Sequence, residues 1–158
     1  KIKNYDISEL KIRMDIIPVS LAIAQAAVES GWGTSRFALE GNALYGQWTW
    51  SDDGLEPLDS EEGDHKVMQF KILTASIKAY KKNLNTHSGY MEFREARANL
   101  RNRNEKVTGL KLTQYLDKYA ATGQEYTKKL ELTIKKNSLS DFENAKLLST
   151  GLRKGIKL

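Results

Sequence analysis

Apolar residues recur at helical spacing along most of the chain. Tyr126, Leu130 and Ile134, for example, are spaced four residues apart and would lie on one face of a helix. Glycine or proline stands close to several of the segment ends, where such residues commonly punctuate helices. The pattern predicts helices over residues 7–14, 18–30, 74–85, 91–103, 108–119 and 126–137.

The segment 18–30 differs from the others because it is apolar nearly all round. Proline at position 18 suits the first turn of a helix, and Gly31 and Gly33 end the pattern. A helix without a polar face is expected to be buried. We therefore expect the helix over 18–30 to lie at the centre of the fold.

Residues 41–73 read as an extended insert. Apolar and polar residues alternate over 65–72, which is typical of a half-buried strand. Before them, residues 52–64 hold seven carboxylates in thirteen positions. We predict a small β-hairpin or flap with an acidic tip, inserted into an otherwise α-helical fold.

The length of the chain, 158 residues, suits one domain with one hydrophobic core. No internal repeat or low-complexity run interrupts the chain. We expect a single domain over residues 1–142. The remainder, residues 143–158, contains two glycines and is expected to form a loosely held C-terminal tail.

Several classes of site are disfavoured by composition. The chain has no cysteine, which excludes disulfides and Cys-ligated metals. His65 and His87 are 22 residues apart and make a zinc site improbable. No Gly-rich phosphate loop is present, no apolar run is long enough to span a membrane, and no signal peptide is visible. We expect no metal, no cofactor and no membrane span.

The net charge of +5 is unevenly distributed. Residues 1–90 carry 10 Lys and Arg against 12 Asp and Glu, and residues 91–158 carry 15 against 8. A basic half attracts polyanions such as nucleic acid, anionic lipid or anionic wall polymer. On charge alone, a solvated helical surface rich in lysine is the preferred explanation, and no nucleic-acid motif supports nucleic acid as a partner.

Glu29 is the strongest candidate for chemistry. The predicted helix places it in the last turn, beside the small or weakly polar face made by Ala22, Gln25 and Ala26. Limited solvation and the negative end of the helix dipole both disfavour the charged carboxylate, and so both raise its pKa. A carboxylic acid that stays protonated near neutral pH can donate a proton in catalysis. The alternative is a frayed helix end with Glu29 in water.

Three motifs in order resemble the glucosaminidase superfamily of peptidoglycan hydrolases. Residues 26–38 (AAVESGWGTSRFA) resemble its catalytic signature, 42–46 (NALYG) its Asn-Leu-Phe-Gly element, and 119–126 (YAATGQEY) its C-terminal tyrosine motif. Residues 83–87 (NLNTH), with Tyr90 and Arg97, are most similar to the Bax-type branch. The resemblance runs from about residue 15 to about residue 140, and its Glu-Ser-Gly-Trp-Gly part is shared with lytic transglycosylases.

The resemblance implies a lysozyme-like α domain and cleavage of the β-1,4 bond after N-acetylglucosamine in peptidoglycan glycan strands. It implies that Glu29 is the general acid and that Tyr119 lies near the scissile bond. The residues expected to bind substrate are Trp32, Asn42, Tyr45, Gln47, Trp48, Trp50 and Tyr126. Among these, Trp32 is expected to wall the site and Tyr126 to be chiefly structural, and core packing is a serious alternative for Trp48.

A second catalytic group remains open. A nucleophilic carboxylate would lie roughly 5 Å from the acid, and a base that activates water roughly 6.5–9.5 Å away. Glu56 is the best placed by alignment among the flap carboxylates, most of which are expected to form a solvated turn. Assistance by the substrate acetamido group, positioned by Tyr119, would make a second carboxylate unnecessary.

Two other functions compete with the hydrolase. A lytic transglycosylase would use the same Glu29 and give a 1,6-anhydro product. A non-catalytic glycan-binding envelope protein would keep the groove but tolerate loss of Glu29. For each of these functions we expect a monomer in the periplasm or cell envelope, with glycan strands as the partner.

Overall fold

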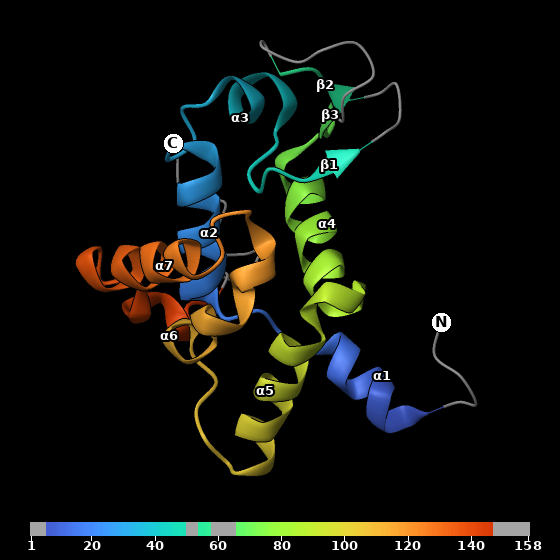
Figure 1. Ribbon diagram of the computed structural model, residues 1–158, viewed down its shortest axis with the longest axis vertical. Coiled ribbons are helices and arrows are strands. Elements are labelled where there is room, and N and C mark those ends of the chain that lie inside the picture. The colour runs from blue at the N-terminus through green and yellow to red at the C-terminus, as the bar shows by residue number, and fades with distance from the viewer. Residues whose placement is uncertain (1–5, 50–53, 58–65, 147–158) are drawn as a thin grey trace, which may run out of the picture.

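The computed structural model describes residues 6–49, 54–57 and 66–146. Most of these residues are helical, and a small antiparallel sheet lies at one end (Figure 1). The α-helices are α1 (Ile7–Met14), α2 (Val19–Ser30), α3 (Arg36–Gly41), α4 (Leu73–Thr86), α5 (Met91–Asn102), α6 (Gly109–Leu112) and α7 (Gln124–Lys136). The 3-10 helices are η1 (Ser88–Tyr90), η2 (Thr113–Tyr119) and η3 (Leu139–Asn144).

Five of the six predicted helices are confirmed, and two features differ from the expectation. The segment 108–119 is not one α-helix, because Leu116 has non-helical dihedral angles and the segment continues from α6 as the 3-10 helix η2. Helix α3 was not predicted, because it has only six residues. Its one local signal is Ser35, whose side-chain oxygen accepts a hydrogen bond from the Ala38 N–H at 3.2 Å and caps the helix.

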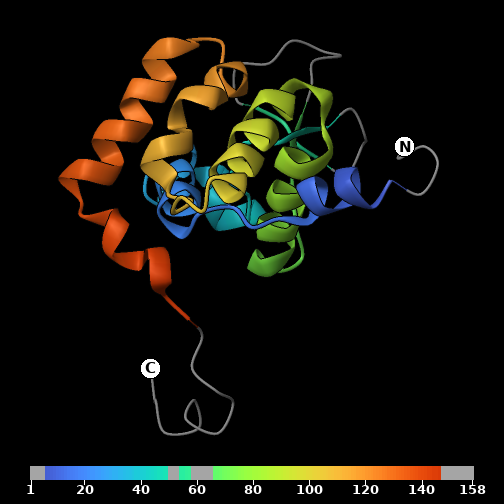
Figure 2. The ribbon, with the colours of Figure 1, turned by 90° about the horizontal axis from the view of Figure 1, so that it is seen from below.

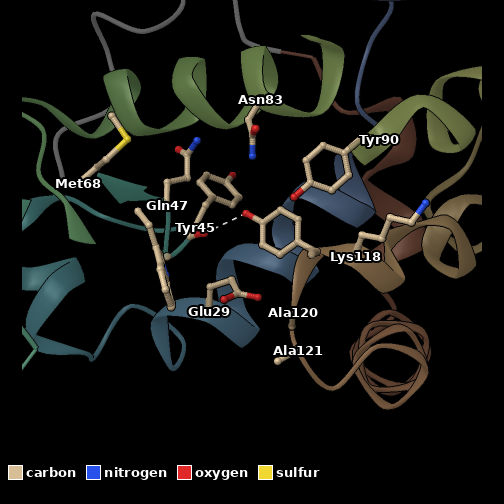
Figure 3. A pocket seen from close by; sticks show the side chains of 12 residues that line it. Glu29, Tyr45, Gln47, Met68, Asn83, Tyr90, Lys118, Ala120 and Ala121 are labelled. Atoms are coloured by element: carbon tan, nitrogen blue, oxygen red, sulfur yellow. Dashed lines mark hydrogen bonds between the residues drawn. The ribbon is translucent and has the colours of Figure 1, made fainter. Parts of the chain in front are cut away.

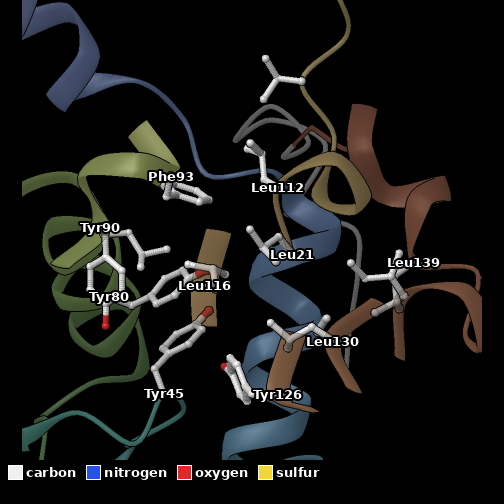
Figure 4. Packing of buried hydrophobic residues seen from close by; sticks show 14 residues of the cluster. Leu21, Tyr45, Tyr80, Tyr90, Phe93, Leu112, Leu116, Tyr126, Leu130 and Leu139 are labelled. Carbon is white, nitrogen blue, oxygen red and sulfur yellow. The ribbon is translucent and has the colours of Figure 1, made fainter. Parts of the chain in front are cut away.

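Helix α2 lies inside the fold, as its all-round apolar sequence predicts. It packs against α6, α7 and η3, and Leu21 and Ala24 on it are fully buried. Around Leu21, the core brings together Leu116 from η2 and Leu130 from α7 with aromatic side chains from α4 and α5 (Figure 4). Every residue of α2 is buried or half-buried, so this helix is the element around which the rest of the fold packs.

The extended insert forms a three-stranded sheet of very short strands. Strands β1 (Trp48–Thr49), β2 (Gly54–Leu55) and β3 (Lys66–Met68) pair antiparallel in the order β1-β3-β2. Val67 of the central strand stands opposite Trp48 on one side and Leu55 on the other. A small β insert is therefore confirmed. Its predicted acidic tip falls mostly on residues 50–53 and 58–65, outside the described residues.

Helix α1 is attached through a buried arginine. Figure 2 shows α1 beside α4 and α5, away from α7. The Arg97 guanidinium, fully buried, donates to the carbonyls of Ile12 and Ile16 at 2.6 and 2.7 Å and to Asn85 Oδ1 at 2.7 Å. Asp15 lies 3.6 Å from Arg97 and accepts from Arg101 at 3.0 Å. One side chain thus joins the α1–α2 connection to α4 and α5.

The C-terminal part of the described chain is tied to the core. Glu143 Oε1 accepts the Ser20 hydroxyl at 2.5 Å and the Gly109 N–H at 2.7 Å. Gly109 is needed here because a Cβ would lie 2.2 Å from Ser20 Oγ. Helix η3 crosses the predicted boundary at residue 142, and the division into 1–142 and 143–158 stays a prediction. In the described ranges, no helix is both long and apolar enough to cross a bilayer.

We predict that Arg97→Met lowers the free energy of unfolding by about 3 kcal/mol, because it leaves two carbonyls and one amide oxygen without their buried donor. Urea denaturation of wild type and variant measures the difference. Arg103→Met, a matched change at an exposed position near the end of the same helix, is expected to stay within about 0.5 kcal/mol of wild type. Equal effects of both variants would contradict the prediction.

Candidate active site

Glu29 stands at the buried end of α2, beside an open pocket. The helix ends at Gly31, which adopts the left-handed conformation and donates its N–H to the Ala27 carbonyl. This turn follows directly from the glycine that the sequence places two residues after Glu29. The pocket has a volume of about 710 Å³, which is ample for a sugar unit.

Four parts of the chain enclose this pocket (Figure 3). Glu29 from α2 forms the floor, and the segment 45–48 and Met68 of the sheet form one wall. Asn83 of α4 and Tyr90 of η1 lie opposite Glu29, and residues 118–121 close the remaining side. The pocket thus lies between the helical core and the sheet, lined by segments distant in sequence.

Burial raises the pKa of Glu29 above its ordinary value, and hydrogen bonding by Tyr126 and the charge of Lys129 oppose that rise. One carboxylate oxygen, Oε1, is buried and has no hydrogen-bond partner within the described part of the chain. A buried carboxyl oxygen without a partner favours the protonated form. The predicted direction of the shift agrees with this geometry, in which Glu29 can present a proton to the pocket.

Gly46 lets the backbone approach Glu29 closely. A Cβ at position 46 would lie 3.1 Å from Glu29 Oε2, and the residue has a φ of +57°. Both conditions favour glycine, since a side chain would crowd the carboxyl group and strain the backbone. The last residue of the 42–46 motif therefore shapes the space around the acid.

A buried amide sets the position of Tyr126. Gln25, one turn before Glu29 on α2, donates from Nε2 to Tyr126 Oη at 3.0 Å and accepts the Tyr80 hydroxyl on Oε1 at 2.7 Å. Because Tyr126 Oη accepts from Gln25, its own proton is free to point toward Glu29. Gln25 thus links α4 and α7 to the helix that carries the acid.

Tyr119 borders the pocket and is already partnered. Its hydroxyl donates to the Tyr45 carbonyl at 2.9 Å, and its ring is parallel to that of Tyr126 at 5.6 Å between centroids. Burial, reinforced by the charge of Glu29, raises the pKa of Tyr119 well above its ordinary value. Tyr119 is consequently a neutral phenol at physiological pH, with an oxygen still able to accept a hydrogen bond.

Five predicted site residues come together at this pocket: Glu29, Tyr45, Gln47, Trp48 and Tyr119. Trp48 is 56% exposed, which excludes the core-packing interpretation of this side chain. Tyr45 stacks on Tyr80 with centroids 3.9 Å apart, and burial raises its pKa to about 12. Gln47 Oε1 is buried and, among the described residues, has no hydrogen-bond partner, so it offers an acceptor to a bound molecule.

The other predicted residues lie elsewhere. Asn42 ends α3 with a φ of +51° and donates from Nδ2 to the Phe70 carbonyl at 2.9 Å, which is a structural role. Trp32 does not line this pocket. Tyr126 lies behind Glu29 in the core, as its expected structural role requires. Trp50 lies outside the described residues.

Glu56 is directed to the surface of the flap. Its carboxylate pairs with Lys66 at 3.0 Å, its side chain is largely exposed, and its carbonyl accepts from Arg36. It is not among the residues that line the pocket, where Glu29 is the only carboxylate among the described residues. The structure thus does not bring Glu56 to the acid.

Sequence reasoning had not assigned a site role to Gln25, Gly46, Met68, Asn83, Tyr90 or Lys118. Asn83 and Tyr90 stood in the segment that resembles the Bax-type branch, which was their one available signal. Gly46 ends the 42–46 motif and Gln25 lies one helical turn before Glu29, so the sequence offered a signal for both. Met68 and Lys118 are brought to the pocket by the packing of segments that are distant from Glu29 in sequence. Among the described residues, no group of three or more His, Asp or Glu side chains is arranged to hold a metal ion.

We predict that Tyr126→Phe raises the pKa of Glu29, because the lost hydroxyl stabilises the carboxylate form. NMR titration of the Glu29 side-chain carboxyl carbon measures this pKa directly. Tyr115→Phe serves as the control, since Tyr115 does not line the pocket of Glu29. A lower pKa of Glu29 in Tyr126→Phe would show that the hydroxyl does not stabilise the carboxylate.

Comparisons with known proteins find two similar chains. Protein bax of Escherichia coli strain K12 is 38% identical over 114 residues, which are 72% of this chain and 40% of that protein. The chain therefore spans well under half of that relative. The catalytic domain of the autolysin Auto from Listeria monocytogenes has the same fold, with a TM-score of 0.54 and 20% identity over 89% of this chain and 90% of the other.

The sequence model of one family covers most of the chain. The glucosaminidase family, described as mannosyl-glycoprotein endo-beta-N-acetylglucosaminidase, matches residues 5–139. This range contains α2, the sheet and the tyrosine motif, and so every described residue that lines the pocket. The expected likeness to the Bax-type branch and the expected lysozyme-like fold are also confirmed. The chain belongs to the glucosaminidase family.

Proposed function

We propose that this domain hydrolyses peptidoglycan as an endo-β-N-acetylglucosaminidase, with Glu29 as the general acid. One observation carries the proposal: the carboxyl group of Glu29 lies in an open pocket and has a raised pKa. One of its oxygens has no hydrogen-bond partner among the described residues. Such a group can protonate the glycosidic oxygen as the bond breaks. Family membership supports the reaction class.

The remaining walls suit a sugar with an acetamido group. Trp48 offers an exposed aromatic face for a pyranose ring, and Gln47 Oε1 offers an unpaired acceptor for an N–H or O–H. The Tyr119 oxygen, whose proton is held by the Tyr45 carbonyl, offers a second acceptor. These groups would bind and orient N-acetylglucosamine beside Glu29.

The second catalytic group is proposed to be the substrate acetamido group. With Glu29 the one carboxylate among the described lining residues, no other described residue of the pocket supplies a carboxylate that could act as nucleophile or base. Tyr119 is neutral and therefore no base, but its oxygen can position the acetamido N–H. Glu56, paired with Lys66 on the flap, is not assigned a catalytic role here.

The proposed substrate also indicates where the domain acts and what it binds. Glycan strands of peptidoglycan lie in the bacterial envelope, so we propose that the domain acts in the periplasm or cell envelope. The likenesses to protein bax and to an autolysin catalytic domain are consistent with this placement. A monomer is sufficient, because one chain supplies every group that the proposal uses.

We predict that Glu29→Gln slows the digestion of purified peptidoglycan by at least about 100-fold, because the amide keeps the shape but has no proton to donate. Mass spectrometry of the released muropeptides measures both the rate and the product. Glu40→Gln, a matched change on the exposed surface of α3, is expected to digest at the wild-type rate. Wild type should release reducing N-acetylglucosamine ends.

Three other results would reject parts of this proposal. Products with 1,6-anhydromuramoyl ends would identify a lytic transglycosylase. Binding of glycan without cleavage by wild type would identify a glycan-binding protein. Equal digestion rates in wild type and Glu29→Gln would remove Glu29 as the acid.

We also predict that Gly46→Ala lowers kcat by roughly tenfold or more, because the added methyl group would lie 3.1 Å from Glu29 Oε2. Gly33→Ala is the control: Gly33 has a φ of +80°, but no atom lies within 4 Å of a Cβ there. In both variants the left-handed backbone conformation is expected to lower the free energy of unfolding by about 1–2 kcal/mol, which thermal unfolding measures. Equal losses of kcat would show that backbone strain, rather than crowding of Glu29, matters.

A further inference from the structure

A second groove of about 480 Å³ runs along α7, next to the site of Glu29. Trp32 lines it from the turn after α2. Residues one helical turn apart on α7 line the other side, namely Lys128, Leu132 and Lys136, with Lys129 and Glu125 beside them. The proposed chemistry at Glu29 does not use this groove.

The turn after α2 holds Trp32 outward. Trp32 has a φ of +58°, a conformation that costs a non-glycine residue about 1–2 kcal/mol. Its N–H donates to the Ala27 carbonyl at 2.8 Å, and the next N–H, of Gly33, donates to Ser30 Oγ at 2.8 Å. The side chain is nevertheless 61% exposed, so burial in the core does not explain its presence. A strained, exposed tryptophan fits a binding surface.

The groove is positively charged. Three lysines, Lys128, Lys129 and Lys136, line it against one carboxylate, that of Glu125. Within the described chain, neither Lys128 nor Lys136 forms an ion pair, whereas Lys135, adjacent in sequence but outside the groove, pairs with Glu131. The ammonium groups attract negative charge and the indole offers an apolar face, so the groove is complementary to an organic ligand that carries both carboxylates and apolar groups.

The groove adjoins the active-site pocket. Trp32 follows Glu29 by three residues on the same turn, and Lys129 in the groove acts electrostatically on Glu29. On the other side, only Thr122 and Gly123 separate Ala121 of the pocket from the first residue of α7. A polymer bound at Glu29 can therefore reach the groove with a short branch.

We infer that this groove binds the carboxylate-bearing stem peptide of the glycan strand held in the active-site pocket. This inference rests on the proposed function. Stem peptides branch from the lactyl group of the muramic acid next to each N-acetylglucosamine, and they carry free carboxylates. Their apolar side chains suit Trp32 and Leu132, and their carboxylates suit Lys128 and Lys136.

Binding is tested without cleavage, by NMR of the full chain carrying Glu29→Gln. Isolated stem peptide should shift the indole N–H signal of Trp32 in a titration that weakens with added salt. The same peptide with its carboxylates amidated, and a peptide-free chito-oligosaccharide, should shift that signal much less. The inference is overturned if the indole signal does not move, or if it moves equally with the amidated peptide.

Selectivity is tested by kinetics on strands with and without stem peptides. Lys128→Gln/Lys136→Gln should lower the ratio of kcat/KM for stem-bearing over stem-free strands by about fivefold, since each exposed ion pair contributes modestly. Lys106→Gln/Lys135→Gln removes the same charge from exposed positions outside the groove and should keep the wild-type ratio. Lys129 stays unchanged in both variants because it acts on Glu29.

The two proposals can fail separately. If wild type cleaves both kinds of strand and both double variants keep the wild-type ratio, the stem-peptide groove is wrong and the proposed hydrolase stands. If no strand is cleaved while stem peptide still shifts the Trp32 signal, the hydrolase is wrong and the groove stands. A third result would also overturn the stem-peptide assignment. In it, a phosphate polymer of the teichoic acid type displaces the stem peptide from the groove, and stem-bearing and stem-free strands are cleaved at equal rates.

Discussion

The fold around the site depends on one buried polar group, the Gln25 side chain. An amide inside a core is costly unless both its donor and its acceptor are used. Here the acceptor is used by Tyr80 of α4 and the donor by Tyr126 of α7, so a single side chain of α2 fixes two helices that pack on different sides. Buried polar groups that are fully paired specify one arrangement of their neighbours, because any other arrangement leaves them unpaired. The tyrosine cluster that backs the pocket is the consequence.

The acid takes its properties from that arrangement. Helix α2 is buried because it has no polar face, and its last turn emerges where the left-handed Gly31 redirects the chain. Glu29 is therefore held between a buried helix and the backbone of Gly46, with Tyr126 already oriented by Gln25. Desolvation and hydrogen bonding then act on its pKa in opposite directions. The proposed role of Glu29 as general acid needs this balance, since full burial would leave no path to substrate and full exposure would leave the carboxyl group ionised at neutral pH.

Local sequence patterns predicted the elements, and the resemblance predicted the centre of the site. Periodicity was sufficient for α1, α2 and α7, and the motifs placed Glu29, Tyr45, Gln47, Trp48 and Tyr119 in one pocket, as the structure does. Tyr126 was expected to be chiefly structural and lies in the core, but neither kind of evidence predicted that Asn42 and Trp32 would lie outside the pocket. Asn42 and Trp32 both lie in motif segments and both adopt positive φ, yet one ends a helix and the other faces a separate groove. That difference depends on tertiary packing of α3 and α7, which no local pattern encodes.

The turn after α2 joins the two proposed binding regions physically. Glu29 and Trp32 lie on either side of the left-handed Gly31, and Lys129 on α7 acts on the first while lining the groove of the second. In the free domain the positive charge of Lys129 favours the ionised form of Glu29, which is the wrong form for a general acid. A carboxylate bound in the groove would offset that charge and return Glu29 toward its protonated form. The two proposed regions are therefore coupled through one side chain, that of Lys129, which lines the groove and whose charge acts on Glu29.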